Sequence, residues 1–316
     1  MPRSRTYTGG CGGARLRTYI GLLGTYRRNR SFAEHDYEQV FRQAKSAFEQ
    51  YGEIPLEEAR VLEIGCGQRY SATLLFHSLG VHIVGIDYDV INTRTSWRGL
   101  RAAVSANGIE RTLKSLVRRA IFDRRYYALL ERKLGRPLVF DGLNLRSMDA
   151  CALRFDGEVF DYAFSNAAFE HIYDAEKAVA ELARVLRPGG VAYVAIHLFP
   201  SLSGGHHLEW AVPDERPSTR VPPWDHLRAS AHPSDVYLNK LRERDYLAAF
   251  ERNFSLVDAS SRYEGHQLLT QEIRGELRDY SESDLLKRTL ILVARKSGQC
   301  QDSPPEASNT DALAPR

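Results

Sequence analysis

The chain has 316 residues, of which 43% are hydrophobic and 26% are charged. This length suits one large domain with insertions or two modest domains, and the composition is typical of soluble proteins with an apolar core. The net charge of +3 does not indicate a nucleic-acid partner, which would require a concentrated basic face. No run approaches the ~18 consecutive apolar residues of a membrane span. The four cysteines form no CxxC pair, as is usual in a reducing compartment, so we expect a cytoplasmic protein.

Residues 1–55 are expected to form a loose segment followed by one helix. The first part has poor periodicity, whereas residues 31–51 repeat apolar side chains at helical spacing. The main domain is expected over 56–296. It opens with a strand at 60–64, a helix at 71–79 and a second strand at 81–86, which is the beginning of a parallel sheet.

The same alternation continues toward the C-terminus. Asp174 is placed to cap a helix that ends before Pro188-Gly189-Gly190, and a further helix is expected near 234–251. Short apolar runs predict the remaining strands at 159–165, 191–196, 254–259 and 289–296. Strands that alternate with helices in this way predict an α/β fold with a mostly parallel sheet.

Three segments interrupt this pattern. Residues 91–137 form a predicted helical insertion with one apolar and one basic face, and the basic face is either solvated or binds an acidic or phosphorylated substrate or an anionic surface. Residues 197–232 form a loop rich in proline, glycine and histidine, too long for a simple connection. Residues 297–316 are polar and proline-bearing, so we expect a disordered tail.

The stretch "VLEIGCGQRYSATLL" (61–75) changes from strand to helix through two glycines. Gly65 and Gly67 lack Cβ atoms, so the backbone can turn sharply there and a ligand can lie against it. Asp87 ends the next strand, where a carboxylate can accept hydrogen bonds from both hydroxyls of a ribose. The arrangement therefore predicts a nucleoside site.

Two nucleoside ligands fit this turn, a dinucleotide and S-adenosylmethionine. A dinucleotide usually requires GxGxxG, and the third glycine is absent here. Glu63 also places a negative charge two residues before the first glycine. That charge would repel a pyrophosphate and attract the ammonium and sulfonium of S-adenosylmethionine, which is the favoured ligand.

Four segments in chain order resemble the class I S-adenosylmethionine-dependent methyltransferases, and within them the type 11 group that includes quinone-biosynthesis enzymes. These segments are "VLEIGCG", "IVGIDYD", "MDACALRFDGEVFDYAFSNAAFEHI" and "LARVLRPGGVAYVAI". The resemblance covers about residues 60–200 and implies a Rossmann-like, seven-stranded sheet with helices on both faces. The sequence departs from many relatives at Arg69-Tyr70, where a small residue is common.

The resemblance also implies roles for individual residues. Glu63, Gly65 and Gly67 would line the methionine and ribose portion, and Asp87 would hold the ribose hydroxyls. Asp149 would face the adenine amino group, with Ala150 beside the ring. Asn166 would lie under the methionine part, and "FEHI" (169–172) would open a helix at the rim of the site.

The loop at 197–232 is expected to meet the substrate, because ligands bind beyond the carboxyl ends of parallel strands. Its histidines allow three interpretations: a metal site, packing or surface residues, and acceptor binding with proton removal between Trp210 and Trp224. No HxH or HxxxH spacing supports a metal, so none is predicted. His206 or His207 is the preferred catalytic base, and His171 is the reserve candidate.

The leading hypothesis is methyl transfer from S-adenosylmethionine to a small-molecule acceptor, at a hydroxyl. The alternatives are a dinucleotide-dependent oxidoreductase and a non-catalytic scaffold that binds the cofactor. A small-molecule substrate is expected, without nucleic acid and without a membrane span, and the sequence leaves the oligomeric state open.

Overall fold

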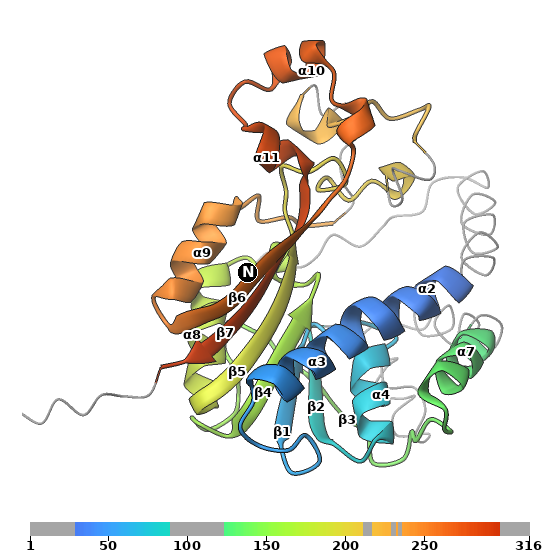
Figure 1. The fold of residues 1–316 in the computed structure, drawn as a ribbon, viewed down its shortest axis with the longest axis vertical. Coiled ribbons are helices and arrows are strands. Elements are labelled where there is room, and N and C mark those ends of the chain that lie inside the picture. Colours follow the sequence, from blue (N-terminus) through green and yellow to red (C-terminus); the bar gives the residue numbers. More distant parts are fainter. Residues whose placement is uncertain (1–28, 89–122, 211–216, 229–231, 233–235, 298–316) are drawn as a thin grey trace, which may run out of the picture.

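A single seven-stranded sheet forms the centre of the protein (Figure 1). The computed structural model describes residues 29–88, 123–210, 217–228, 232 and 236–297. The strands, in the spatial order β3-β2-β1-β4-β5-β7-β6, are β1 (Arg60–Ile64), β2 (His82–Asp87), β3 (Asn144–Ser147), β4 (Phe160–Asn166), β5 (Leu186–His197), β6 (Phe254–Tyr263) and β7 (Lys287–Lys296). β7 runs antiparallel to both of its neighbours, and the pairs among β1 to β5 are parallel. The predicted α/β fold is confirmed, with a mixed sheet.

The strand register brings the polar ends of three strands to one edge of the sheet. Ile64, the last residue of β1, pairs with Ile86 of β2 and with Ser165 of β4. The residues that follow these positions, Gly65, Asp87 and Asn166, therefore lie side by side at the carboxyl edge. This is where open parallel sheets place their ligands.

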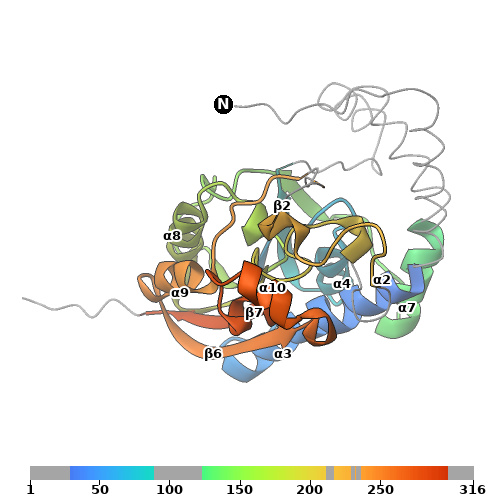
Figure 2. The ribbon, with the colours of Figure 1, turned by 90° about the horizontal axis from the view of Figure 1, so that it is seen from above.

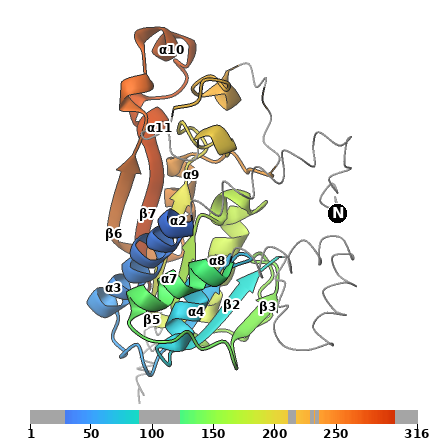
Figure 3. The ribbon, with the colours of Figure 1, turned by 90° about the vertical axis from the view of Figure 1, so that its right-hand side faces the viewer.

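Helices cover both faces of the sheet (Figure 3). One face carries α2 (Asn29–His35), the π-helical segment η1 (Asp36–Phe41), α3 (Arg42–Tyr51), α4 (Ser71–Ser78) and α7 (Arg124–Leu134), and the other carries α8 (Ala175–Val185) and α9 (Glu243–Glu251). Alternate residues of β4 separate the two cores, since Tyr162 belongs to the first and Ala163 to the second. Asp174 caps α8 as predicted, because its side chain accepts a hydrogen bond from the Lys177 N–H.

The N-terminal helix is part of the main core. Phe48 of α3 stacks on Tyr162 of β4 with ring centroids 4.8 Å apart, and Phe41 packs edge-on against Phe76 of α4 at 4.8 Å. The boundary predicted at residue 55 thus divides two parts that share one apolar core. The predicted loose segment lies mostly outside the described residues.

A small lobe extends beyond the carboxyl edge, at the top of Figure 1. It contains η4 (Leu208–Trp210), η5 (Asp225–Leu227), η6 (His266–Leu268), α10 (Gln271–Glu276) and α11 (Glu282–Leu286). Trp210 and Trp224 are 1% and 0% exposed in its separate apolar core, and the Trp224 indole donates to the Leu285 carbonyl at 3.2 Å. Both rings therefore hold the lobe together, and neither forms a wall for the acceptor.

Several element boundaries differ from those predicted. β3 is a polar edge strand with no apolar run to indicate it, and β5 begins at Leu186, before the Pro-Gly-Gly turn. α9 begins at Glu243 rather than near 234. The predicted insertion at 91–137 is described only from Asp123 onward, and the predicted tail lies outside the described residues except Ser297. Within the described residues, no helix has the length and apolar character needed to cross a membrane.

Candidate active site

The turn after β1 needs its two glycines. Gly65 and Gly67 have φ angles of 78° and 63°, in the left-handed region that favours glycine. A Cβ atom on Gly65 would lie 2.3 Å from the Ala168 Cβ, so a side chain does not fit. The Gly67 N–H donates to Asp87 Oδ2 at 2.9 Å, which fastens the turn to the end of β2.

A pocket of about 360 Å³ lies on one side of this turn, and we call it the Asp87 pocket. Asp87 and Tyr88 line it from β2, while Asp149 and Ala150 line it from the loop after β3. Asp149 Oδ1 accepts a hydrogen bond from the Cys151 N–H at 2.8 Å, which fixes the direction of the carboxylate. The pocket combines two carboxylates with apolar walls, as a nucleoside requires.

A second pocket, of about 450 Å³, shares Gly65 and Gly67 with the first, and we call it the Glu63 pocket. Glu63 is 4% exposed, and burial raises the pKa of its carboxyl to about 7 against the lowering effect of its hydrogen bond from Thr73. Asn166 also lines this pocket, at the end of β4. A cation bound here would favour the ionised carboxylate.

Asp36 is a residue of this pocket that the sequence did not reveal. It lies in η1, and its Oδ2 accepts hydrogen bonds from the Tyr126 hydroxyl and, at 3.2 Å, from the Ser71 hydroxyl. The helical pattern of residues 31–51 predicted the element that carries Asp36. Only the packing of that helix over α4 brings its acid to the glycine turn.

The two pockets together fit an elongated ligand with a nucleoside at one end and a cation at the other. Four carboxylates line the two pockets, and their negative charges would repel the pyrophosphate of a dinucleotide. A family model described as a methyltransferase domain matches residues 122–194, from α7 into β5. This part of the chain is therefore a methyltransferase domain, and the enzyme is S-adenosylmethionine-dependent. Its cofactor is S-adenosylmethionine, and the narrower kinship with quinone-biosynthesis enzymes stays a prediction.

Solved structures of similar proteins include several methyltransferases. An S-adenosylmethionine-dependent methyltransferase from Mesorhizobium loti is 15% identical over 81% of this chain and 96% of its own, with a TM-score of 0.43. Geranyl diphosphate C-methyltransferase from Streptomyces coelicolor is 15% identical over 81% of this chain and 78% of its own, with a TM-score of 0.44. The [4+2]-cyclase SpnF is 16% identical over 81% and 80%, with a TM-score of 0.40. These values are too low to indicate an acceptor for this methyltransferase.

The predicted histidines separate into two groups. His171 lines the Asp87 pocket, and the His206 ring lies edge-on to it with ring centroids 4.8 Å apart. The His207 ring lies 6.5 Å from His226 instead. The loop bends closely here, since a Cβ on Gly205 would lie 2.6 Å from the His226 ring.

Proton positions follow from the neighbours of these rings. His171 Nδ1 lies 2.8 Å from the Tyr237 carbonyl oxygen, which can only accept, so Nδ1 carries the proton and Nε2 keeps a lone pair. Burial lowers the pKa of His206 to about 4, with further lowering by His171, Arg288 and His226. His206 is therefore neutral at pH 7, although it is a weak base.

Proposed function

We propose that this methyltransferase methylates a hydroxyl of a small-molecule acceptor bound beside the Asp87 pocket. S-adenosylmethionine supplies the methyl group on a sulfonium, whose positive charge makes the sulfur a good leaving group. The proposal rests on one observation above all: the wall of the Asp87 pocket contains a histidine, His171, whose tautomer leaves Nε2 able to accept a proton.

The cofactor would be held along the glycine turn. Asp87 would accept hydrogen bonds from the ribose hydroxyls, and Asp149 would accept one from the adenine amino group beside Ala150. Glu63 and Asn166 would bind the methionine part in the Glu63 pocket. This placement is supported by the way the two pockets meet at Gly65 and Gly67, which would lie against the methionine and ribose portion.

The acceptor oxygen must lose its proton as it forms a bond to the methyl carbon. His171 Nε2 would take that proton while the carbon–sulfur bond breaks and its electron pair stays on sulfur. The products are a methyl ether, S-adenosylhomocysteine and an imidazolium that releases its proton to solvent. We place the base at His171 rather than at His206 or His207, because His171 lines the pocket and the His207 ring lies toward His226.

The test is a labelled-methyl assay against a metabolite extract, followed by alanine variants of the three histidines. His171→Ala should lower turnover by about 10²–10⁴ while S-adenosylhomocysteine binding is retained. His207→Ala is the matched control and should keep most of the activity. Near-full turnover in His171→Ala would remove it as the base, and no labelled product with any extract would favour a non-catalytic scaffold.

A further inference from the structure

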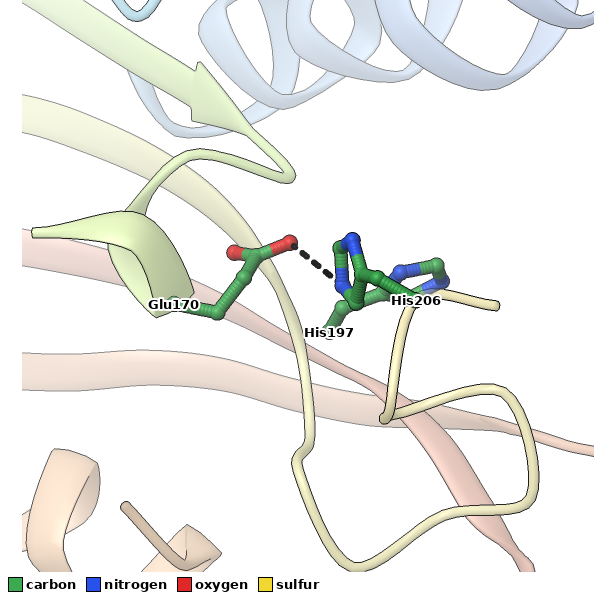
Figure 4. A group of neighbouring side chains, drawn as sticks. All are labelled: Glu170, His197 and His206. Carbon is green, nitrogen blue, oxygen red and sulfur yellow. Dashed lines mark ion pairs between the residues drawn. The ribbon is translucent and has the colours of Figure 1, made fainter. Parts of the chain in front are cut away.

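Three polar side chains converge beside the Asp87 pocket, and we call them the Glu–His–His cluster (Figure 4). Glu170 comes from the 3₁₀ turn η3 (Phe169–His171) after β4, His197 is the last residue of β5, and His206 comes from the loop. One donor atom from each residue lies within 4.8 Å of the others. Segments well apart in the chain thus place two imidazoles and one carboxylate around a common point.

The Glu170 carboxyl has an unusual environment. The residue is 2% exposed, and neither carboxyl oxygen has a partner with full hydrogen-bond geometry among the described residues, although the backbone N–H groups of Glu170 and His197 lie close enough to lower its pKa somewhat. Its nearest ionisable partner is His206, whose Nε2 lies 3.9 Å from Oε1, beyond hydrogen-bond distance. A buried carboxyl so weakly hydrogen-bonded costs free energy, and a cation between Glu170 Oε1 and His206 Nε2 would lower that cost.

The three side chains offer the donor atoms that a metal ion requires. A neutral imidazole offers one nitrogen lone pair, and a carboxylate offers an oxygen. A bound dication would favour the ionised form of the Glu170 carboxyl.

We propose that the Glu–His–His cluster binds one first-row transition-metal dication of the Zn²⁺ class. Two imidazoles and one carboxylate are a donor set typical of such ions, whereas Mg²⁺ and Ca²⁺ prefer oxygen ligands. Metal–ligand bonds of about 2.1 Å would separate tetrahedral donor atoms by about 3.4 Å. The side chains, whose donor atoms now lie within 4.8 Å of one another, would therefore draw together by up to about 1.4 Å, which side-chain rotation can supply.

Arg288 is the competitor of the metal. Its Nε donates to His197 Nε2 at 2.9 Å, so a metal must bind at Nδ1 or displace this guanidinium. The same Nε lies 3.4 Å from Glu264 Oε2, which offers Arg288 a second partner. The positive charge of Arg288 also repels a cation, so a neutral residue at this position should strengthen metal binding.

The position of the cluster gives the metal a role, and this part rests on the proposed function. His171 follows Glu170 in the chain, and its ring packs against His206. A metal with an open coordination position would bind the acceptor oxygen and lower the pKa of its hydroxyl. His171 would then remove this more acidic proton.

The experiment titrates tag-free, chelator-dialysed protein with Co²⁺, followed by calorimetry and by the visible ligand-field absorption of the ion. We expect one equivalent to bind and Zn²⁺ to displace it. Glu170→Gln, His197→Ala and His206→Ala should each weaken Co²⁺ binding by at least about tenfold. Loss of a residue that only supports a metal ligand already costs about 10- to 100-fold in affinity. His82→Ala, an exposed histidine at the start of β2, is the matched control and should bind like the wild type.

Arg288→Gln should have the opposite effect and tighten Co²⁺ binding about tenfold, because it removes a positive charge beside His197. S-adenosylhomocysteine binding, measured on every variant, shows that each one folds. The inference is overturned if folded wild-type protein binds no stoichiometric Co²⁺, or if the three cluster variants bind it as the wild type does. Methyl transfer that persists after chelation would overturn the metal's catalytic role and leave the proposed function intact. Stoichiometric Co²⁺ binding without methyl transfer to any hydroxyl acceptor would overturn the proposed function and leave the metal site intact.

Discussion

Glu63 and Asp87 lie on either side of the glycine turn and have different environments. Glu63 is buried, with a pKa raised to about 7, whereas Asp87 is partly exposed and fastened by the Gly67 N–H. Both positions follow from the sequence, because each acid lies at a fixed offset from a predicted strand end. The raised pKa does not, because it results from burial under η1 and from the nearby negative charges of Asp36 and Asp87.

Replacing Asp87 should weaken cofactor binding. Asp87→Ala removes charge-assisted hydrogen bonds worth about 1.5–3 kcal/mol, which corresponds to roughly ten- to a hundredfold in affinity for S-adenosylhomocysteine. Asp87→Asn keeps an acceptor for the Gly67 N–H, so its affinity should lie between those of the wild type and Asp87→Ala. Calorimetry checks both variants, and equal affinity in all three proteins would show that the ribose is held elsewhere.

Binding of S-adenosylhomocysteine should depend on pH through Glu63. The ligand carries an ammonium, so it binds the ionised carboxylate better, and affinity should rise as pH increases from about 6 to about 8. In the folded, ligand-free protein the Glu63 carboxyl keeps its proton to higher pH than it does in the unfolded chain. The free energy of unfolding of the ligand-free protein therefore falls as pH rises from 4.5, the ordinary pKa of a glutamate carboxyl, toward 7.

Glu63→Gln provides the control for this pH dependence. The amide cannot ionise, so the affinity of the variant should be lower at pH 8 and nearly constant across the interval. A wild-type affinity that does not change between pH 6 and 8 would contradict the position of the ammonium beside Glu63.

At the scale of elements, the connection between β1 and α4 is the most constrained part of the site. Its positive φ angles and its contact with Ala168 both require glycine at position 65. The sequence indicated this turn by its pattern alone. It could not indicate that Ala168, about a hundred residues later, supplies the steric reason.

Gly65→Ala should therefore abolish measurable cofactor binding, because its Cβ would meet Ala168 within 2.3 Å. Gly80→Ala is the matched control, since Gly80 has a similar φ of 89° but no atom within 4 Å of an added Cβ. Both variants pay the same backbone strain, so both should lose stability in a melting experiment. If Gly65→Ala binds S-adenosylhomocysteine as well as Gly80→Ala does, the close approach has no functional role.

At the scale of the whole molecule, the sequence predicted the sheet and the cofactor pocket better than the acceptor side. Strands such as β1 and β4 are buried on both faces, so their apolar runs identify them directly. The lobe is different, because its short helices have little periodicity and its core joins residues of the 197–232 loop to α10 and α11. Trp224 looked like a ligand wall in sequence and is a core residue in the structure.

The histidines illustrate the same difference. Sequence spacing argued against a metal because adjacent histidines rarely share an ion, and His206 and His207 do separate to different neighbours. The residues that gather around His206 come from β5 and from the turn after β4. Only the fold brings Glu170 and His197 together with His206, beside the carboxyl edge of the sheet. Figure 2 shows how the lobe lies over this edge.

A paired calorimetric titration with S-adenosylhomocysteine and with NAD tests the central claim most directly. The two pockets and their four carboxylates predict one S-adenosylhomocysteine site per chain and no binding of NAD, whose pyrophosphate these acids repel. Binding of NAD, or no binding of S-adenosylhomocysteine by folded protein, would contradict the assignment of this site to S-adenosylmethionine.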